Sequence, residues 1–257
     1  MEDIRNLILE RQKRERQNKD QQLAKKLDIA MDDPRRFWKI RAYKKAYLFI
    51  SIHNDQAHPS TLWARGNEIR LFRMPDVDSR FFEPVRNGIK QLVDAYHLPF
   101  EVNVYGIDQA MSAQVNDAVH DSKLDFETLA GIVVQESLRD PRRGGLPHAD
   151  VVITHIPYTG RYGDMGKSQF AQGLVTFSIT PKTQTNFLER LAIHEAGRLL
   201  GYGLDHATEI EMWGSPYPKS TCNMEWSCPT ITMCEQCDDF FTYFWKGVTD
   251  VTGIRFT

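Results

Sequence analysis

One strand followed by one helix constrains the fold of this chain more than any other stretch of its 257 residues. Residues 173–179 alternate apolar and polar side chains, which is typical of a half-buried strand. Residues 186–200 then carry apolar side chains at helical spacing, and Asn186 with Glu189 resembles a capping pair at a helix start. Gly201 is expected to end this helix in a left-handed turn. A strand that leads into a helix in this way predicts a layered α/β domain.

The second half of the predicted helix carries the pattern of a metal site. His194, Glu195 and Gly201 match the H-E-x-x-H-x-x-G-x-x-H pattern of zinc hydrolases, in which two histidines one turn apart bind zinc and the glutamate acts as general base. Arg198 stands where the second histidine belongs. A guanidinium offers only hydrogen-bond donors and stays charged, so it cannot bind the metal.

The third histidine of the pattern is displaced as well. Strict spacing places it at Leu204, which cannot bind metal, and His206 lies two residues further on. His206 can serve as a ligand only if the turn around Gly201 and Gly203 absorbs the insertion. The sequence therefore predicts the outline of a metal-dependent hydrolase together with a substitution that disables it.

The rest of the chain supports the α/β prediction. Apolar, β-branched or alternating stretches predict further strands at residues 46–53, 99–105 and 150–156, and either a strand or a turn segment at residues 68–74. Amphipathic spacing predicts helices at residues 81–96 and 125–138, and glycines make residues 157–172 look like a loop.

The N-terminal region differs in character from the remainder. Residues 1–33 form a predicted charged helical arm that extends to about residue 31, and residues 34–257 form the globular domain. The middle of the arm has no apolar residue, so it is either a solvated segment or one that becomes ordered against a partner.

Residues 34–47 interleave basic and aromatic side chains. This segment either grips nucleic acid or forms an amphipathic helix whose Phe37, Trp38, Ile40 and Tyr43 cover the sheet.

Composition restricts the class of protein. A net charge of −2 gives no global bias toward nucleic acid or anionic membranes, and no apolar run approaches the length of a membrane helix. We expect a soluble protein of the cytoplasm, or of an organelle after removal of a transit peptide. The cysteines are clustered near the C-terminus, which suits a metal site in a reducing compartment better than a disulfide framework. They are Cys222, Cys228, Cys234 and Cys237.

The cysteines also extend the motif of the helix. Cys222-Asn-Met224 is a C-x-M motif, and Cys234-Glu-Gln-Cys237 is a C-x-x-C motif followed by an aromatic helix. With the helix of His194, this order resembles the archaemetzincins, a metzincin-like family of small zinc proteins. The resemblance covers the chain from about residue 46 in element order and is specific in motif from His194 to Cys237.

The resemblance implies a metzincin-like zincin fold with a mixed twisted sheet and an active-site helix, to which this chain adds its helical arm. It also implies a catalytic zinc held by three histidines and a structural zinc held by four cysteines. Met224 would form the Met-turn beneath the active site, and residues 173–179 would be the edge strand that holds an extended peptide substrate. Family members usually carry a cysteine where this chain has Ala207, and Cys228, absent from the family pattern, restores the count of four. We therefore expect a structural zinc site rebuilt from Cys222, Cys228, Cys234 and Cys237.

Three functions stay open from the sequence. A pseudoprotease keeps the fold and the structural zinc, while Arg198 pairs with Glu195 or Asp205 in place of the catalytic metal. An active zinc peptidase would use His194, His206 and a substitute ligand, His155 or Asp205, with Glu195 as general base. An accessory subunit of a ribonucleoprotein or another large assembly would bind its protein or ribonucleoprotein partner through the arm and residues 34–47.

Overall fold

A five-stranded sheet forms the centre of the computed structural model, which describes residues 2–52, 68–139, 148–159, 165–169, 173–201, 222–224 and 230–252. The strand order is β2-β1-β5-β7-β6, and every neighbouring pair is parallel except β6 with β7. The strands are β1 (Glu68–Arg73), β2 (Glu101–Gly106), β5 (His148–Thr154), β6 (Gly166–Gln169) and β7 (Leu174–Ser178). The predicted α/β class with a mixed sheet is confirmed.

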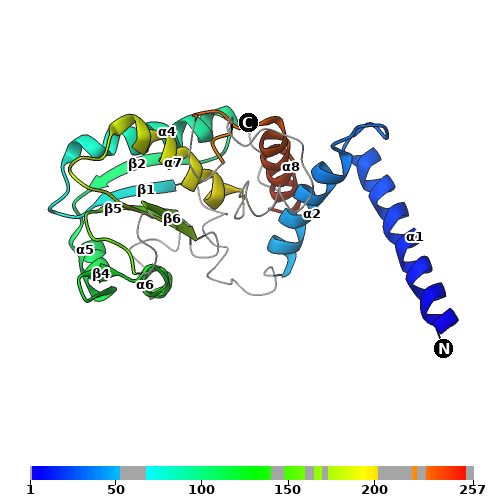
Figure 1. Ribbon diagram of the computed structural model, residues 1–257, viewed down its shortest axis with the longest axis horizontal. Coiled ribbons are helices and arrows are strands. Elements are labelled where there is room, and N and C mark those ends of the chain that lie inside the picture. Colours follow the sequence, from blue (N-terminus) through cyan, green and yellow to red (C-terminus); the bar gives the residue numbers. More distant parts are fainter. Residues whose placement is uncertain are drawn as a thin grey trace.

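Helices cover both faces of this sheet (Figure 1). One face carries α4 (Phe82–Ala95), which follows a short 3-10 turn η2 (Ser79–Phe81), and α7 (Thr185–Leu200). The other face carries α5 (Gln109–Asp117), α6 (Phe126–Arg139) and a small hairpin of β3 (Val119–His120) and β4 (Lys123–Leu124). At Gly88 a Cβ atom would lie 2.4 Å from the Glu189 carbonyl oxygen, so α4 and α7 meet at backbone level.

A second packing unit lies beside the sheet, where α2 (Arg36–Ile52) packs along α8 (Glu235–Thr252) (Figure 1). At Gly247 of α8 a Cβ atom would lie 2.7 Å from the Tyr43 carbonyl oxygen and 2.8 Å from the Ala46 Cβ atom. The Trp38 indole N–H donates to the Gln236 carbonyl at 2.7 Å. The two helices therefore pack closely, although nearly two hundred residues separate them in the sequence.

The predicted strand at residues 46–53 is wrong, because α2 continues through this stretch to Ile52. Its apolar, β-branched composition suits a buried strand or a buried helix equally well, so composition alone does not distinguish them. In the structure α2 packs along α8, which comes from the far end of the chain, and this contact favours the helix.

The basic and aromatic residues of the 34–47 segment are largely engaged within the protein. Trp38 and Tyr43 are buried, and Trp38 packs against Phe240 of α8 with ring centroids 5.2 Å apart. Arg35 forms ion pairs with acidic residues of α8, at 2.7 and 3.0 Å. Phe37, expected to cover the sheet, is 57% exposed. The amphipathic helix is thus confirmed, but its buried aromatic residues face α8.

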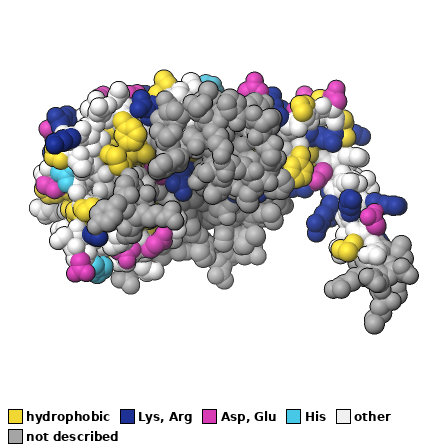
Figure 2. Space-filling view, in the orientation of Figure 1, with side chains coloured by type: hydrophobic (Ala, Val, Ile, Leu, Met, Phe, Trp, Pro, Cys, Tyr) yellow, Lys and Arg dark blue, Asp and Glu magenta, His cyan; other side chains and the backbone are white. Residues whose placement is uncertain are grey.

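The N-terminal helix α1 (Glu2–Lys26) projects away from the body of the protein (Figure 1). Residues 9–19 are exposed, and Lys and Arg side chains gather over the middle of the helix (Figure 2). The C-terminal end of α1 and the residues that follow it are anchored, because Ala24, Leu27 and Ile29 pack with Ile40 and Tyr43. No helix in the described part of the chain is long and apolar enough to cross a membrane.

Candidate functional site

Helix α7 holds the residues singled out for hydrolytic chemistry, but its ends differ from the prediction. It begins at Thr185, and the N-cap residue Gln184 makes no capping hydrogen bond with its side chain. The predicted cap at Asn186 is wrong, because Asn186 already lies inside the helix. The left-handed turn at Gly201 is also wrong. Its φ is −101°, and its N–H closes a regular helical bond to the Gly197 carbonyl at 2.8 Å.

His194 is oriented in the way that metal-binding histidines are. Its side chain is buried, and its Nδ1 atom lies 2.9 Å from the carbonyl oxygen of Asn223. A carbonyl can only accept a hydrogen bond, so Nδ1 carries a proton, and in the neutral imidazole Nε2 then offers its lone pair. Proteins commonly fix metal-ligating imidazoles by such a bond. One imidazole of the predicted metal site is therefore still prepared for coordination.

Glu195, the predicted general base, is covered by strand β6. Its carboxylate is buried and accepts a hydrogen bond from the Ser168 hydroxyl at 2.6 Å. At Gly166 a Cβ atom would lie 2.7 Å from Cγ of Glu195, so only glycine leaves room for this side chain. The carboxylate is thus enclosed by the strand and already hydrogen-bonded within the protein.

Strand β6 also corrects two predictions. It lies inside residues 157–172, which were expected to be a loop, and it forms the edge of the sheet. Residues 173–179, expected at the edge, contain β7, which is paired on both sides. The sequence of β6, Gly166–Gln169, is four residues of mostly polar character, so no apolar alternation marks it as a strand.

Arg198 lies one helical turn after His194 and points its charge at Glu195. The Arg198 Nη1 atom is 3.7 Å from the Glu195 Oε2 atom, and the arginine side chain is 34% exposed. The Nε atom of Arg198 is buried without a hydrogen-bond partner. The predicted pair of Arg198 with Glu195 is therefore present. The other predicted partner, Asp205, and the displaced ligand His206 lie outside the described residues.

Asn223, which the sequence analysis passed over, ties α7 to the cysteine-containing segment. Besides accepting from His194 through its carbonyl, it donates through its side-chain amide to the carbonyls of Arg190 at 2.9 Å and Thr230 at 2.7 Å. Its backbone N–H donates to the Thr232 carbonyl at 2.7 Å. The signal for this role was its place inside the C-x-M motif.

Met224 packs directly beneath α7. Its side chain is fully buried, and a Cβ atom at Gly197 would lie 2.6 Å from the Met224 sulfur. The methionine therefore fills the space left by the missing side chain at Gly197, one residue before Arg198. The Met-turn role that the resemblance implies for Met224 stays a prediction.

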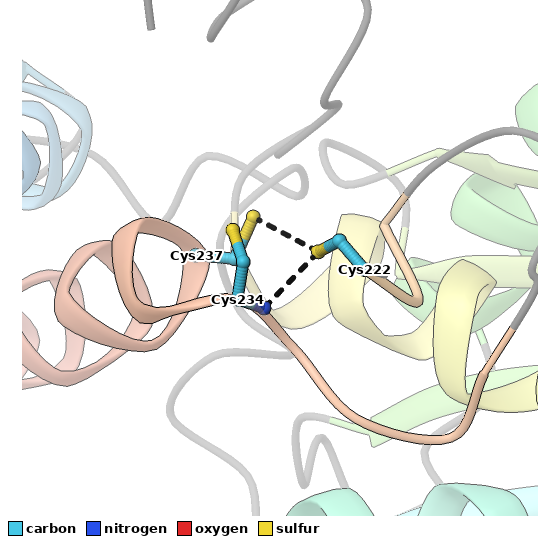
Figure 3. Close-up of side chains that lie close together, drawn as sticks. All are labelled: Cys222, Cys234 and Cys237. Carbon is cyan, nitrogen blue, oxygen red and sulfur yellow. Dashed lines mark hydrogen bonds between the residues drawn. The ribbon is translucent and has the colours of Figure 1, made fainter. Parts of the chain in front are cut away.

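Cys222, Cys234 and Cys237 converge at the start of α8 (Figure 3). Their three sulfur atoms lie within 4.8 Å of one another, and the Cys222 and Cys237 sulfurs are 3.6 Å apart. The Cys234 N–H donates to the Cys222 sulfur at 3.2 Å. Three thiols at this spacing are able to surround one metal ion, and thiolate ligands suit zinc. Cys228, the fourth predicted ligand, lies outside the described residues.

The surroundings of Cys237 favour the neutral thiol when no cation is bound. Its hydrogen bonds with the Cys222 and Cys234 thiols, and then its burial, raise the pKa of Cys237 well above the ordinary range. A bound metal dication would reverse this balance, because it stabilises thiolates directly. The cluster is therefore a chemically suitable metal site, and the Cys237 thiol on its own is a poor nucleophile.

His155 does not join the site around His194. Its Nδ1 atom lies 2.8 Å from the Ile179 carbonyl, and its ring meets Phe81 edge to face. Across the described ranges, the cysteine trio is the one group of three or more potential ligands within mutual reach. The described residues therefore offer no three-ligand set around His194.

Comparisons with known proteins give one likeness in structure. No family model and no curated protein matches the sequence. The chain is similar to the crystal structure of an archaemetzincin from Methanopyrus kandleri, with a TM-score of 0.48 and 13% identity over 71% of this chain and 97% of that chain. With a TM-score below 0.5 and an identity of 13%, this likeness supports no conclusion about the present chain, whose chemistry is inferred from its own residues.

Proposed function

We propose that this chain is a zinc-binding pseudoprotease, in which zinc held by cysteines stabilises an archaemetzincin-like fold that no longer hydrolyses peptides. The observation that carries the proposal is the ion pair of Arg198 with Glu195, 3.7 Å apart, on the helix face where a hydrolase needs a second neutral ligand. The resemblance implies both a structural and a catalytic zinc, and we propose that this chain keeps the structural one alone.

Electrostatics oppose a catalytic metal beside Arg198. A guanidinium cannot lose its proton at physiological pH, and two positive charges a few ångströms apart repel strongly where water is scarce. Zinc at a catalytic site normally has three protein ligands and an open position. Among the motif's metal-ligand positions that the structure describes, His194 is the one that keeps both its identity and a suitable orientation.

The general base is also engaged. Glu195 would have to receive a proton from a metal-bound water, but its carboxylate is buried, accepts from Ser168 at 2.6 Å and faces Arg198. These contacts hold the carboxylate against β6 and the arginine. They replace a metal-bound water as its hydrogen-bonding partner.

The structural zinc is assigned to Cys222, Cys234 and Cys237, with Cys228 proposed as the fourth ligand. When bound, zinc would supply a tetrahedral cross-link between the 222–224 segment and the start of α8. This segment carries Asn223 and Met224, which contact α7, so the cross-link would also stabilise the helix of His194. Free thiols used as ligands fit a reducing compartment, and we propose the cytoplasm as the setting.

Zinc stoichiometry and a peptide-hydrolysis assay test the proposal together. Purified full-length protein should hold one zinc per chain, lose it on Cys234→Ser, keep it on His194→Ala, and cleave no member of a mixed peptide library. A second zinc that is lost with His194→Ala, together with cleavage lost on Glu195→Gln, would instead establish an active metallopeptidase.

The projecting helix α1 favours a role within an assembly. It is a charged helix whose residues 9–19 are exposed, and its N-terminal part extends away from the body of the protein. We propose that it binds a protein or ribonucleoprotein partner. Deletion of residues 2–19 should leave zinc content and thermal unfolding unchanged but abolish co-purification with the partner from the native source. Unchanged co-purification would contradict this role.

A further inference from the structure

A cavity of about 480 Å³ lies at the start of α7, apart from the cysteine cluster. Its volume falls within the range of small-molecule sites. The end of β7, the start of β6, the loop before α7 and the first turns of α7 contribute its walls. The lining residues are Pro157, Met165, Ser178, Thr180, Lys182, Thr183, Gln184, Phe187 and Arg190.

The charges around this cavity have one sign. Lys182 and Arg190 line it, and none of the described lining residues is acidic. Pro157, Met165 and Phe187 supply apolar walls. The cavity therefore combines a positive charge with a surface suited to an apolar group, as ligand sites commonly do.

Arg190 is one of the two cations that line the cavity. Its guanidinium carbon lies 5.8 Å from the centroid of the Phe187 ring, which is an apolar wall of the same cavity. Its Nε atom is closed to solvent, so a ligand would be held by the terminal nitrogens of the guanidinium. A planar carboxylate is the acceptor that matches a guanidinium best.

The start of α7 adds a second source of positive potential. The first N–H groups of a helix have no acceptor within the helix, and they carry the positive end of its dipole. The side chain of the N-cap residue Gln184 does not cap them. An anion in the cavity would lie close to these N–H groups of α7, which the Gln184 side chain leaves uncapped.

The loop that shapes the cavity is held in place. The Thr180 N–H donates to the Thr183 hydroxyl oxygen at 2.9 Å, and the Thr183 N–H donates back to the Thr180 carbonyl at 2.9 Å. Arg80 donates to the Pro181 carbonyl at 2.6 Å. The cavity is thus preformed, which lowers the entropic cost of binding a ligand.

We propose that this cavity binds a carboxylate that carries a compact apolar group, with Arg190 as the principal anchor and Lys182 as a supporting charge. The carboxylate accepts from Arg190, and the apolar group packs against Met165 and Phe187. Such a ligand is a free small acid or the C-terminal residue of a peptide, since both present the same chemistry. The site depends neither on bound zinc nor on loss of hydrolysis, so it goes beyond the proposed function.

N-acetyl-L-leucine and N-acetyl-L-leucinamide form a matched pair of probes, because they differ only in the carboxylate. Calorimetric or NMR titration of the zinc-loaded full chain should show that the acid binds at least about tenfold more tightly than the amide. Arg190→Gln should weaken binding of the acid about tenfold, Lys182→Gln about twofold, and Arg190→Lys should recover part of the loss.

A tripeptide that ends in leucine distinguishes a free acid from a peptide end. Tighter binding than the acid identifies a peptide end, and equal binding identifies a free acid.

Arg86→Gln is the matched control, because Arg86 is an exposed cation of α4 that does not line the cavity. It should bind the acid as the unaltered protein does. Equal affinity for acid and amide, or an Arg190→Gln variant that binds like the Arg86→Gln control, would overturn the proposal. Both variants should keep the zinc content and unfolding temperature of the parent, which separates loss of the ligand from loss of the fold.

Discussion

The two places where this chain resembles a metal protein differ in what surrounds their potential ligands. The Nδ1 atom of His194 and the carboxylate of Glu195 already have partners within the protein, in Asn223, Ser168 and Arg198. At the start of α8 three thiols face one another. The polar groups of the first site have partners within the protein, whereas the second site presents three thiols that are able to surround one metal ion.

On the proposed function, the difference shows how a metal site can be lost without loss of the fold. A buried carboxylate such as Glu195 cannot remain unpaired, because an uncompensated buried charge costs several kcal/mol (roughly 3–5). An arginine one turn away supplies the missing charge from within the chain. Neutral thiols need no such partner, so the cysteine cluster can stay intact with or without metal.

Removing a cysteine from the cluster should have the largest effect. Cys237→Ser is expected to release zinc and lower the free energy of unfolding by about 4 kcal/mol or more, because the metal cross-link is part of the folded state. Urea unfolding with and without a chelator measures the change. In the chelated protein the same substitution should cost much less.

Thr242→Ala provides the control on the same helix, since Thr242 is exposed. It should change neither zinc content nor stability. If Cys237→Ser retained one zinc per chain, the metal would lie elsewhere, and the contrast between the two sites would be lost.

The sequence anticipated the parts of both sites that rest on regular patterns. The apolar spacing of α7 placed His194 and Glu195 on a helix, and cysteine spacing brought three thiols together. It could not anticipate Ser168, because β6 is too short and too polar to show a strand pattern. It also misassigned the end of α2, whose partner α8 lies at the other end of the chain. Local periodicity thus predicts helices and strands well, whereas contacts between segments far apart in the sequence require the three-dimensional structure.

Filling the space beneath α7 should have the next largest effect and test whether the two sites are coupled. Gly197→Val places side-chain atoms where the Met224 sulfur lies, so the 222–224 segment must move. We expect a loss of about 2 kcal/mol in stability and weaker zinc binding at the cysteines, because Cys222 is displaced with Met224. Competition with a zinc-binding dye measures the affinity.

Gly131→Val in α6, where a Cβ atom meets nothing within 4 Å, controls for the effect of valine on helix propensity. Unchanged zinc affinity in Gly197→Val would show that the sites are independent.

Removing the charge that closes the first site should have a moderate effect. Arg198→Met is expected to cost about 1 kcal/mol, because the arginine is one-third exposed and Ser168 still donates to Glu195. Adding Glu195→Gln should restore most of that loss, since the uncompensated charge is then gone. A double-mutant cycle by urea unfolding measures the coupling. Additive costs would mean that the 3.7 Å pair does not stabilise the carboxylate.

The smallest effect concerns the polar contacts that attach α2 to the helix of the cysteine cluster, and it depends on pH. The hydrogen bond from Lys39 lowers the pKa of Asp33, whereas burial raises the pKa of Asp239, the second acid beside that lysine. A lowered folded-state pKa contributes stability above the ordinary value of 3.8, and this contribution is lost as pH falls through the folded value. Asp33→Asn should therefore cost about 1 kcal/mol or less at pH 7, and the cost should shrink steadily below pH 3.8.

Asp239 should show the opposite slope, which makes the pair its own control. Its raised folded-state pKa means that the folded protein binds the proton first, so this group gains stability as pH falls from the folded pKa toward 3.8. As pH falls over that interval, the free energy of unfolding of the parent should rise relative to that of Asp239→Asn. Relative to Asp33→Asn it should stay unchanged until the pH falls below 3.8. Urea unfolding of both variants from pH 7 to pH 2 measures the two slopes. Slopes of the same sign would mean that burial does not dominate at Asp239, and that the polar contacts beside the cysteine cluster behave like ordinary surface pairs.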